Sequence, residues 1–183
     1  SLSDFKKIFS KDFISQLKNL YMCGNHGDPI FAPDCLEIMR YCRHINPNMT
    51  LSITTNGGAR NAEWWEELAS IVSFVNFSVD GLEDTNHLYR QGVKWENVEN
   101  NMDAFISAGG YAKWTFIVFG HNEHQVEEAK LYSKLLGVKD FIIKKSGRYV
   151  YSADLKKRNT HQATNKKGEK TQTLSQPKQE KYQ

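Results

Sequence analysis

Long apolar runs are absent from this 183-residue sequence. No stretch approaches the roughly 20 apolar residues that a membrane helix needs, and residues 1–6 lack the apolar stretch of a signal peptide. Cysteine is scarce too, and the spacing of Cys23, Cys35 and Cys42 matches neither a zinc finger nor a Cys-x-x-Cys motif. We therefore expect a soluble, cytoplasmic protein without a membrane partner, whose cysteines are reduced thiols.

A large charge excess is also lacking, because the formal net charge is only +3. The balance hides an asymmetry: residues 152–183 hold eight Lys and Arg against three Asp and Glu, which leaves the rest of the chain slightly acidic. A nucleic-acid platform would place basic residues among aromatic ones on a folded face. We therefore do not expect nucleic acid among the partners.

Large apolar residues become rare after Tyr151, where only Leu155, Leu174 and Tyr182 remain. Such a segment cannot bury enough apolar surface to offset the entropy lost on ordering. We expect residues 1–151 to form one folded domain and residues 152–183 to be a polar, basic and disordered tail or linker.

Within the body, short apolar or β-branched runs alternate with amphipathic helical segments. This alternation predicts an α/β fold with a parallel sheet, open or rolled into a barrel, and with helices outside it. The expected strands are Leu20–Cys23, Leu51–Thr54, Phe74–Phe77, Trp114–Phe119 and Phe141–Ile143, and the expected helices cover residues 11–18, 35–45, 64–72, 95–106 and 126–136.

Polar and glycine-rich signatures follow four of these strands. In α/β proteins the ligand lies where strands end and helices begin, so the four junctions together outline the rim of one binding site. Each signature taken alone is also explained as an ordinary turn or a helix cap. The signatures are Gly27-Asp28-Pro29, Thr55-Asn56-Gly57, Ser78-Val79-Asp80-Gly81, and Asn122.

Two of these junctions carry chemistry that suits a ligand. The Asp28 carboxylate lies between glycines, where the main chain can approach a ligand closely, and it suits an ammonium group or a metal. Ser78 and Asp80 alternate along a strand, so their hydroxyl and carboxylate are expected on one side, facing ribose hydroxyls or a ligand amine.

In their order and residues, these segments resemble the motifs of the radical S-adenosylmethionine (radical SAM) superfamily, especially the branch whose core precedes a cysteine-rich SPASM extension. Residues 27–29 resemble the family's Gly-Gly-Glu-Pro segment, with Asp in place of Glu. The resemblance runs from about Leu20 to Arg148 and implies a partial (β/α) barrel that binds SAM. It places Asp28 on the methionine amine, Arg90 on the carboxylate, Ser78 and Asp80 on ribose or methionine, and Asn122 near the nucleoside.

The family's Cys-x3-Cys-x2-Cys loop is absent from the 183 residues. In the family its thiolates bind a [4Fe-4S] cluster, which cleaves SAM to give a 5′-deoxyadenosyl radical that abstracts a hydrogen from a peptide or small-molecule substrate. We therefore expect a fragment that lacks the barrel's first strand and is inactive alone.

Two readings from other classes stay open. One is a metal-dependent hydrolase or isomerase on a (β/α) barrel, with ligands drawn from a set of five residues. The other is a non-catalytic binding remnant. The five residues are His26, Asp28, Asp80, His121 and His124.

Overall fold

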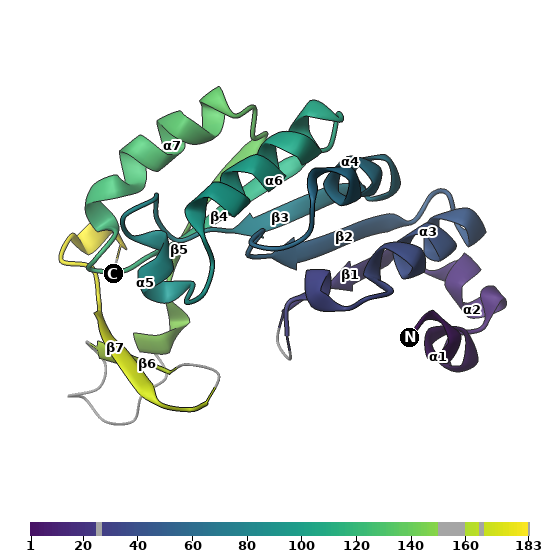
Figure 1. The fold of residues 1–183 in the computed structure, drawn as a ribbon, viewed down its shortest axis with the longest axis horizontal. Coiled ribbons are helices and arrows are strands. Elements are labelled where there is room, and N and C mark those ends of the chain that lie inside the picture. The colour runs from purple at the N-terminus through teal and green to yellow at the C-terminus, as the bar shows by residue number, and fades with distance from the viewer. Residues whose placement is uncertain (25–26, 150–159, 165–166, 183) are drawn as a thin grey trace.

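Five strands form one parallel sheet in the order β1-β2-β3-β4-β5, and this sheet is not closed (Figure 1). The computed structural model describes residues 1–24, 27–149, 160–164 and 167–182. The sheet strands are β1 Asn19–Met22, β2 Thr50–Thr55, β3 Phe74–Ser78, β4 Ala112–Val118 and β5 Asp140–Lys145. The expected α/β architecture with a partial parallel barrel is therefore confirmed, and each expected strand is present within two residues at either end.

Helices α1 and α2 precede β1, and α3 to α7 connect successive strands and lie along the sheet in Figure 1. They are α1 Leu2–Ile8, α2 Lys11–Gln16, α3 Cys35–Ile45, α4 Ala62–Ile71, α5 Asn86–Tyr89, α6 Trp95–Ser107 and α7 Val126–Leu135; the single turns are η1 Pro29–Phe31, η2 Glu123–Gln125, η3 Gly147–Tyr149 and η5 Glu180–Tyr182. None of the helices in these described parts is long and apolar enough to cross a membrane.

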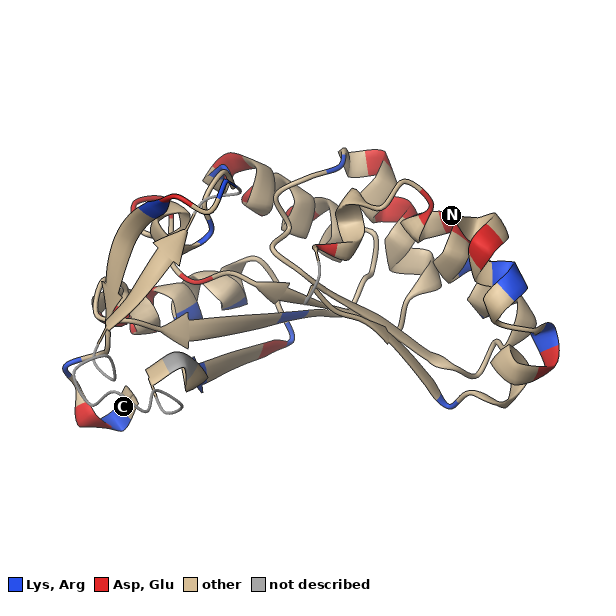
Figure 2. Ribbon diagram, turned by 90° about the horizontal axis from the view of Figure 1, so that it is seen from below, with Lys and Arg blue, Asp and Glu red and all other residues tan. Residues whose placement is uncertain are grey.

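The main core lies between one face of the sheet and the apolar stripes of the helices. Alternate strand residues such as Ile53, Phe77 and Trp114 are fully buried, and so are Trp65 of α4 and Phe105 of α6. Period-2 alternation in the strands and period-3.6 spacing in the helices place these side chains together. On the ribbon, basic and acidic positions are interspersed along the helices (Figure 2).

The parallel register brings the carboxyl ends of neighbouring strands to the same edge of the sheet. Met22 pairs with Ile53, Thr54 pairs with Asn76, and Ser78 pairs with Thr115. The loops that leave β1, β2, β3 and β4 therefore meet at one edge, as the sequence predicts.

The C-terminal segment differs from the sequence prediction of a disordered tail. Residues 160–164 (β6) and 170–175 (β7) form an antiparallel hairpin, seen beyond the ends of β4 and β5 in Figure 1. Leu174 is 1% exposed, and Tyr182 packs into the main core. The prediction is wrong for these residues because a low number of apolar side chains does not show whether the folded body can bury them. Here it buries both Leu174 and Tyr182. Residues 152–159 lie outside the described residues, and the domain boundary at Tyr151 stays a prediction.

Candidate functional site

A cavity of about 200 Å³ lies at the edge of the sheet where β1, β2 and β3 end. Among its lining residues are five of the nine site residues expected from the sequence. The parallel register explains this convergence, because these residues are far apart in the chain but follow adjacent strands. The cavity is lined by Gly24, Asp28, Thr54, Thr55, Asn56, Ser78 and Arg90.

The Asp28 carboxylate joins the loop after β1 to the end of β2. One oxygen, Oδ2, accepts hydrogen bonds from the Thr55 hydroxyl at 3.0 Å and from the Asn56 backbone N–H at 2.7 Å. The other oxygen accepts from the Ile30 N–H at 3.2 Å and caps η1. An ionised carboxylate has about four acceptor positions. Three are used here, so Asp28 keeps an acceptor position and a negative charge at the cavity wall.

The Arg90 guanidinium carries the charge opposite to that of the Asp28 carboxylate, and Asp80 holds it in place. Its Nε and Nη2 atoms both lie 2.7 Å from Asp80 Oδ2. The Asp80 side chain is fully buried, whereas that of Arg90 is 23% exposed. The other carboxylate oxygen of Asp80 accepts the Ile117 N–H at 2.7 Å. This pairing uses two of the five N–H donors of the guanidinium, so Arg90 retains donors that a ligand carboxylate can use.

Asn122 lies behind Asp80 and does not line the cavity. Its buried side-chain amide donates to the backbone oxygens of Asp80 at 2.8 Å and Ile117 at 3.0 Å, and its Oδ1 accepts the Phe119 N–H at 2.7 Å. Asn122 makes no side-chain cap bond to the following turn. These contacts give it a role in fixing the loops after β3 and β4, so the structure does not support the expected helix cap.

The remaining expected residues flank the cavity. Asp80 is behind Arg90, as described, while Gly27 is exposed with φ of 136° and Pro29 is buried in η1. Only glycine adopts such a backbone conformation readily, so Gly27 shapes the turn that delivers Asp28. Their expected roles as ligand contacts stay predictions.

Thr54 lines the cavity but was not among the site residues expected from the sequence, and it belongs to a ladder of neutral polar side chains across the sheet. Asn76 donates to the Thr54 hydroxyl at 3.1 Å, Thr115 donates to the Asn76 amide oxygen at 2.7 Å, and the Tyr21 hydroxyl bonds Thr54. The signal was available: Thr54 and Asn76 alternate with the buried apolar residues of their strands, so they face away from the core.

None of the three cysteines, all of which lie in the described residues, lines this cavity. Cys23 is exposed, whereas Cys35 and Cys42 lie buried on α3. Burial raises the pKa of each of these two thiols to about 11, so they are neutral at physiological pH. The described parts of the chain also contain no group of three His, Cys, Asp or Glu side chains that could hold a metal ion. They therefore do not fit an iron–sulfur cluster, and they do not supply the ligand set of the metal-hydrolase reading; His26 lies outside them.

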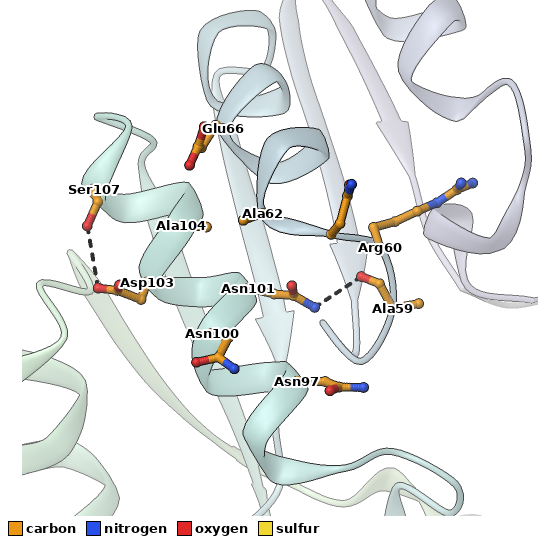
Figure 3. A pocket seen from close by; sticks show the side chains of 11 residues that line it. Ala59, Arg60, Ala62, Glu66, Asn97, Asn100, Asn101, Asp103, Ala104 and Ser107 are labelled. Atoms are coloured by element: carbon orange, nitrogen blue, oxygen red, sulfur yellow. Dashed lines mark hydrogen bonds between the residues drawn. The ribbon is translucent and has the colours of Figure 1, made fainter.

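A larger hollow of about 630 Å³ lies between α4 and α6 and contains none of the expected site residues (Figure 3). Asn101 extends from α6 to the turn after β2, where its amide donates to the backbone oxygens of Gly57 at 2.7 Å and Ala59 at 3.1 Å. The contacts made by Asn101 here support the Thr55–Gly57 turn from behind.

Several solved structures have a similar fold. SuiB of Streptococcus suis superposes with a TM-score of 0.64 and 18% identity over 78% of this chain and 33% of its own. The anSMEcpe structure with bound AdoMet gives 0.54 and 20% over 80% and 43%. A domain of the pyruvate-formate lyase-activating enzyme from Bacteroides vulgatus gives 0.58 and 12% over 70% and 80%. At these identities the likeness concerns the fold, and the chain spans about a third of the length of SuiB.

No curated protein matches the sequence at a significant level. The family model of the radical SAM superfamily, by contrast, matches residues 13–133. This range includes all five cavity residues that were expected from the sequence. That match covers well over half of the 183 residues, and the fold agrees with it. The chain belongs to the radical SAM superfamily.

Proposed function

We propose that this chain forms the SAM-binding portion of a radical SAM enzyme that modifies a peptide. The observation that carries the proposal is the pairing of one carboxylate, Asp28, with one guanidinium, Arg90, at the same small cavity. An α-amino acid group carries the complementary charges, with an ammonium for Asp28 and a carboxylate for Arg90. The methionine part of SAM has this zwitterionic form.

The size of the cavity agrees with binding of this part of the ligand. Pockets for whole drug-sized ligands usually measure about 300–1,000 Å³. The cavity at the ends of β1, β2 and β3 has about 200 Å³ and is therefore suited to an amino acid group, with the nucleoside extending beyond it. Thr54 and Ser78 add hydroxyl groups that can donate to or accept from the ligand.

In this proposal the chain's own residues bind and orient. Asp28 receives the ammonium, and the bonds from Thr55 and Asn56 hold its carboxylate in place. Arg90 receives the carboxylate, oriented from behind by Asp80. When bound, SAM would supply the adenosyl group used in the radical chemistry of the superfamily. We assign no cluster ligand to this chain, because the described thiols do not fit one.

A peptide substrate is supported by the solved structures of similar fold. SuiB has been crystallised bound to its precursor peptide SuiA, and anSMEcpe with AdoMet and a Cp18Cys peptide. Both structures also have the chain-wide similarity described above. The substrate class therefore rests on this likeness, whereas the SAM assignment rests on the cavity itself.

Isothermal titration calorimetry with the 183-residue chain tests the SAM assignment. We expect SAM to bind and 5′-methylthioadenosine, which lacks the amino acid group, to bind much more weakly. Arg90→Ala or Asp28→Asn should each weaken SAM binding about tenfold, because each removes one charge-assisted contact worth about 1.5 kcal/mol. Arg40→Ala is the matched control, since Arg40 also pairs with a carboxylate, Glu67, but lies on α3 away from the cavity.

Two results would contradict the assignment. One is equal affinity for SAM and 5′-methylthioadenosine, which would mean that the amino acid group is not recognised. The other is unchanged SAM affinity in both site variants.

A further inference from the structure

The C-terminal strap, defined here as residues 170–182, is docked closely on the loop that follows β4. The Gly120 N–H donates to the Ser175 carbonyl at 2.8 Å. A Cβ at position 120 would lie 2.2 Å from the Ser175 hydroxyl and 3.0 Å from the Gln176 carbonyl oxygen, so a larger residue would require the strap to shift. Further along, Glu123 Oε2 accepts the backbone N–H groups of Lys178 at 2.8 Å and Gln179 at 3.1 Å.

Apolar side chains continue this docking under the hairpin. Leu174 of the strap is buried in a small cluster with Phe119, Tyr149 and Ala163, separate from the main core. Tyr89 packs against this cluster, with its ring centroid 4.7 Å from that of Phe119. The strap therefore completes an apolar surface on which α5 rests.

Arg90 lies between two residues that the strap or its cluster contacts. On one side, Tyr89 packs on Phe119, and the Arg90 guanidinium carbon lies 4.9 Å from the Tyr89 ring centroid. On the other side, the Gln91 side-chain amide donates to the Thr171 hydroxyl of the strap. Both neighbours of Arg90 are thus linked to the strap, Tyr89 through the apolar cluster and Gln91 through a direct hydrogen bond.

The α5 helix needs such contacts to hold its position. It has four residues, Asn86–Tyr89, and no side-chain N-cap bond. Helices shorter than about 12 residues are marginal by themselves in water, so the place of α5 depends on tertiary packing. Arg90 immediately follows this helix and donates its backbone N–H to Asn86 at 2.8 Å.

We propose that the C-terminal strap positions Arg90 for its ligand, with Leu174 and Thr171 as positioning residues. The strap contacts Tyr89 through the cluster and Gln91 directly, and so keeps the Arg90 guanidinium at the cavity beside Asp80. This inference rests on the proposed function for the identity of the ligand. Residues that the sequence assigns to a disordered tail then contribute to the site without touching it.

A double-mutant cycle in SAM titrations of the full chain tests the proposal. Leu174→Ala should weaken SAM binding about tenfold, as expected if the fraction of molecules with Arg90 in place falls to about a tenth. In an Arg90→Ala background the same change should have no further effect, because the residue that it positions is gone. Leu174→Met should retain affinity, and Leu135→Ala, at an exposed leucine of α7, should change nothing.

An equal loss in both backgrounds, or no loss in either, would overturn the positioning role. If Leu174→Ala does not fold, Thr171→Val replaces it, with Thr173→Val as the matched control. Both threonines are exposed on β7, but Thr173 bonds Gln162 of β6. Weaker SAM binding with Thr171→Val alone supports the proposal, and equal binding by the two variants contradicts it.

Hydrogen exchange without ligand separates this inference from the proposed function. If the unaltered chain does not bind SAM, the proposed function fails, but the strap can still be tested. Amides of residues 86–93 should exchange faster in Thr171→Val than in Thr173→Val. Identical exchange in the two variants would show that the strap does not hold this segment.

Discussion

At the scale of single residues, buried polar groups connect the loops after β3 and β4. Asn122 holds the backbone of Asp80, and Asp80 in turn holds the guanidinium of Arg90. A buried carboxylate is costly unless it is paired and hydrogen-bonded, and here Arg90 and the Ile117 N–H provide both. The sequence predicts that all three side chains lie at the rim of the ligand site. In the structure Arg90 lines the cavity, whereas Asp80 and Asn122 support it from behind.

His121 is the polar residue whose burial has a testable consequence. Its ring stacks on Phe119 at 5.4 Å, and neither ring nitrogen has a hydrogen-bond partner within the described structure. Burial, with smaller contributions from His124 and His87, lowers the pKa of His121 from 6.5 to about 4. The folded state therefore disfavours the protonated ring.

We predict a loss of stability in acid that depends on His121. Between pH 6.5 and about 4 the unfolded state binds more protons, so the His121 contribution is full above pH 6.5 and declines as the pH falls. The loss should be about 2 kcal/mol after allowance for a partly exposed ring. Urea unfolding across this range measures it. His121→Phe should flatten the pH dependence and His44→Gln, at an exposed histidine, should not; equal curves would refute the prediction.

At the scale of elements, local sequence signals decide where helices begin. Asn61 caps α4, where its Oδ1 accepts the Trp64 N–H at 3.3 Å. The helix then presents Trp65 and Leu68 to the core. By contrast, Lys94 stands at the N-cap of α6 without a side-chain cap bond. Packing of Met102 and Phe105 against the sheet therefore compensates for a weak start to α6.

These two helix starts form a matched pair of substitutions. Asn61→Ala should lower the free energy of unfolding by about 1 kcal/mol, the usual cost of losing an N-cap. Lys94→Ala should leave it within about 0.5 kcal/mol, because that side chain makes no cap bond. Urea denaturation at neutral pH measures both. A similar loss in the two variants would mean that the cap bond of Asn61 adds nothing.

At the scale of the whole molecule, the open sheet has two edge strands, β1 and β5. In the described part of the chain β1 pairs only with β2, and β5 only with β4. Tyr21 on β1 is 53% exposed, and Ile142 and Ile143 on β5 are 36% and 40% exposed. Unpaired strand edges with exposed apolar side chains are sites where another chain can add.

We predict that the chain associates in a concentration-dependent way through these edges. Sedimentation velocity at increasing protein concentration measures this association. Ile142→Lys should reduce it, because a charge at an edge strand opposes pairing. Leu135→Lys is the control, since Leu135 is 83% exposed but lies on α7. A monomer at all concentrations would contradict the prediction, as would equal reduction by both variants.

The sequence by itself determined the order of strands and helices, the parallel sheet and the edge at which the site lies, because periodicity and turn residues are local properties. It also located Asp28, Thr55, Asn56, Ser78 and Arg90, which converge on one cavity. Only the tertiary structure decided which polar groups face that cavity and which support it, since burial and pairing depend on residues distant in the chain.

The C-terminal segment shows the same division. Its composition indicates a chain too polar to order alone, and that physical argument holds for an isolated segment. Docking changes the outcome, because Leu174 and Tyr182 each find a buried place and Gly120 leaves room for the backbone. The surface that these residues fit is created by the folded body, so their docking does not follow from the local sequence pattern of residues 160–182.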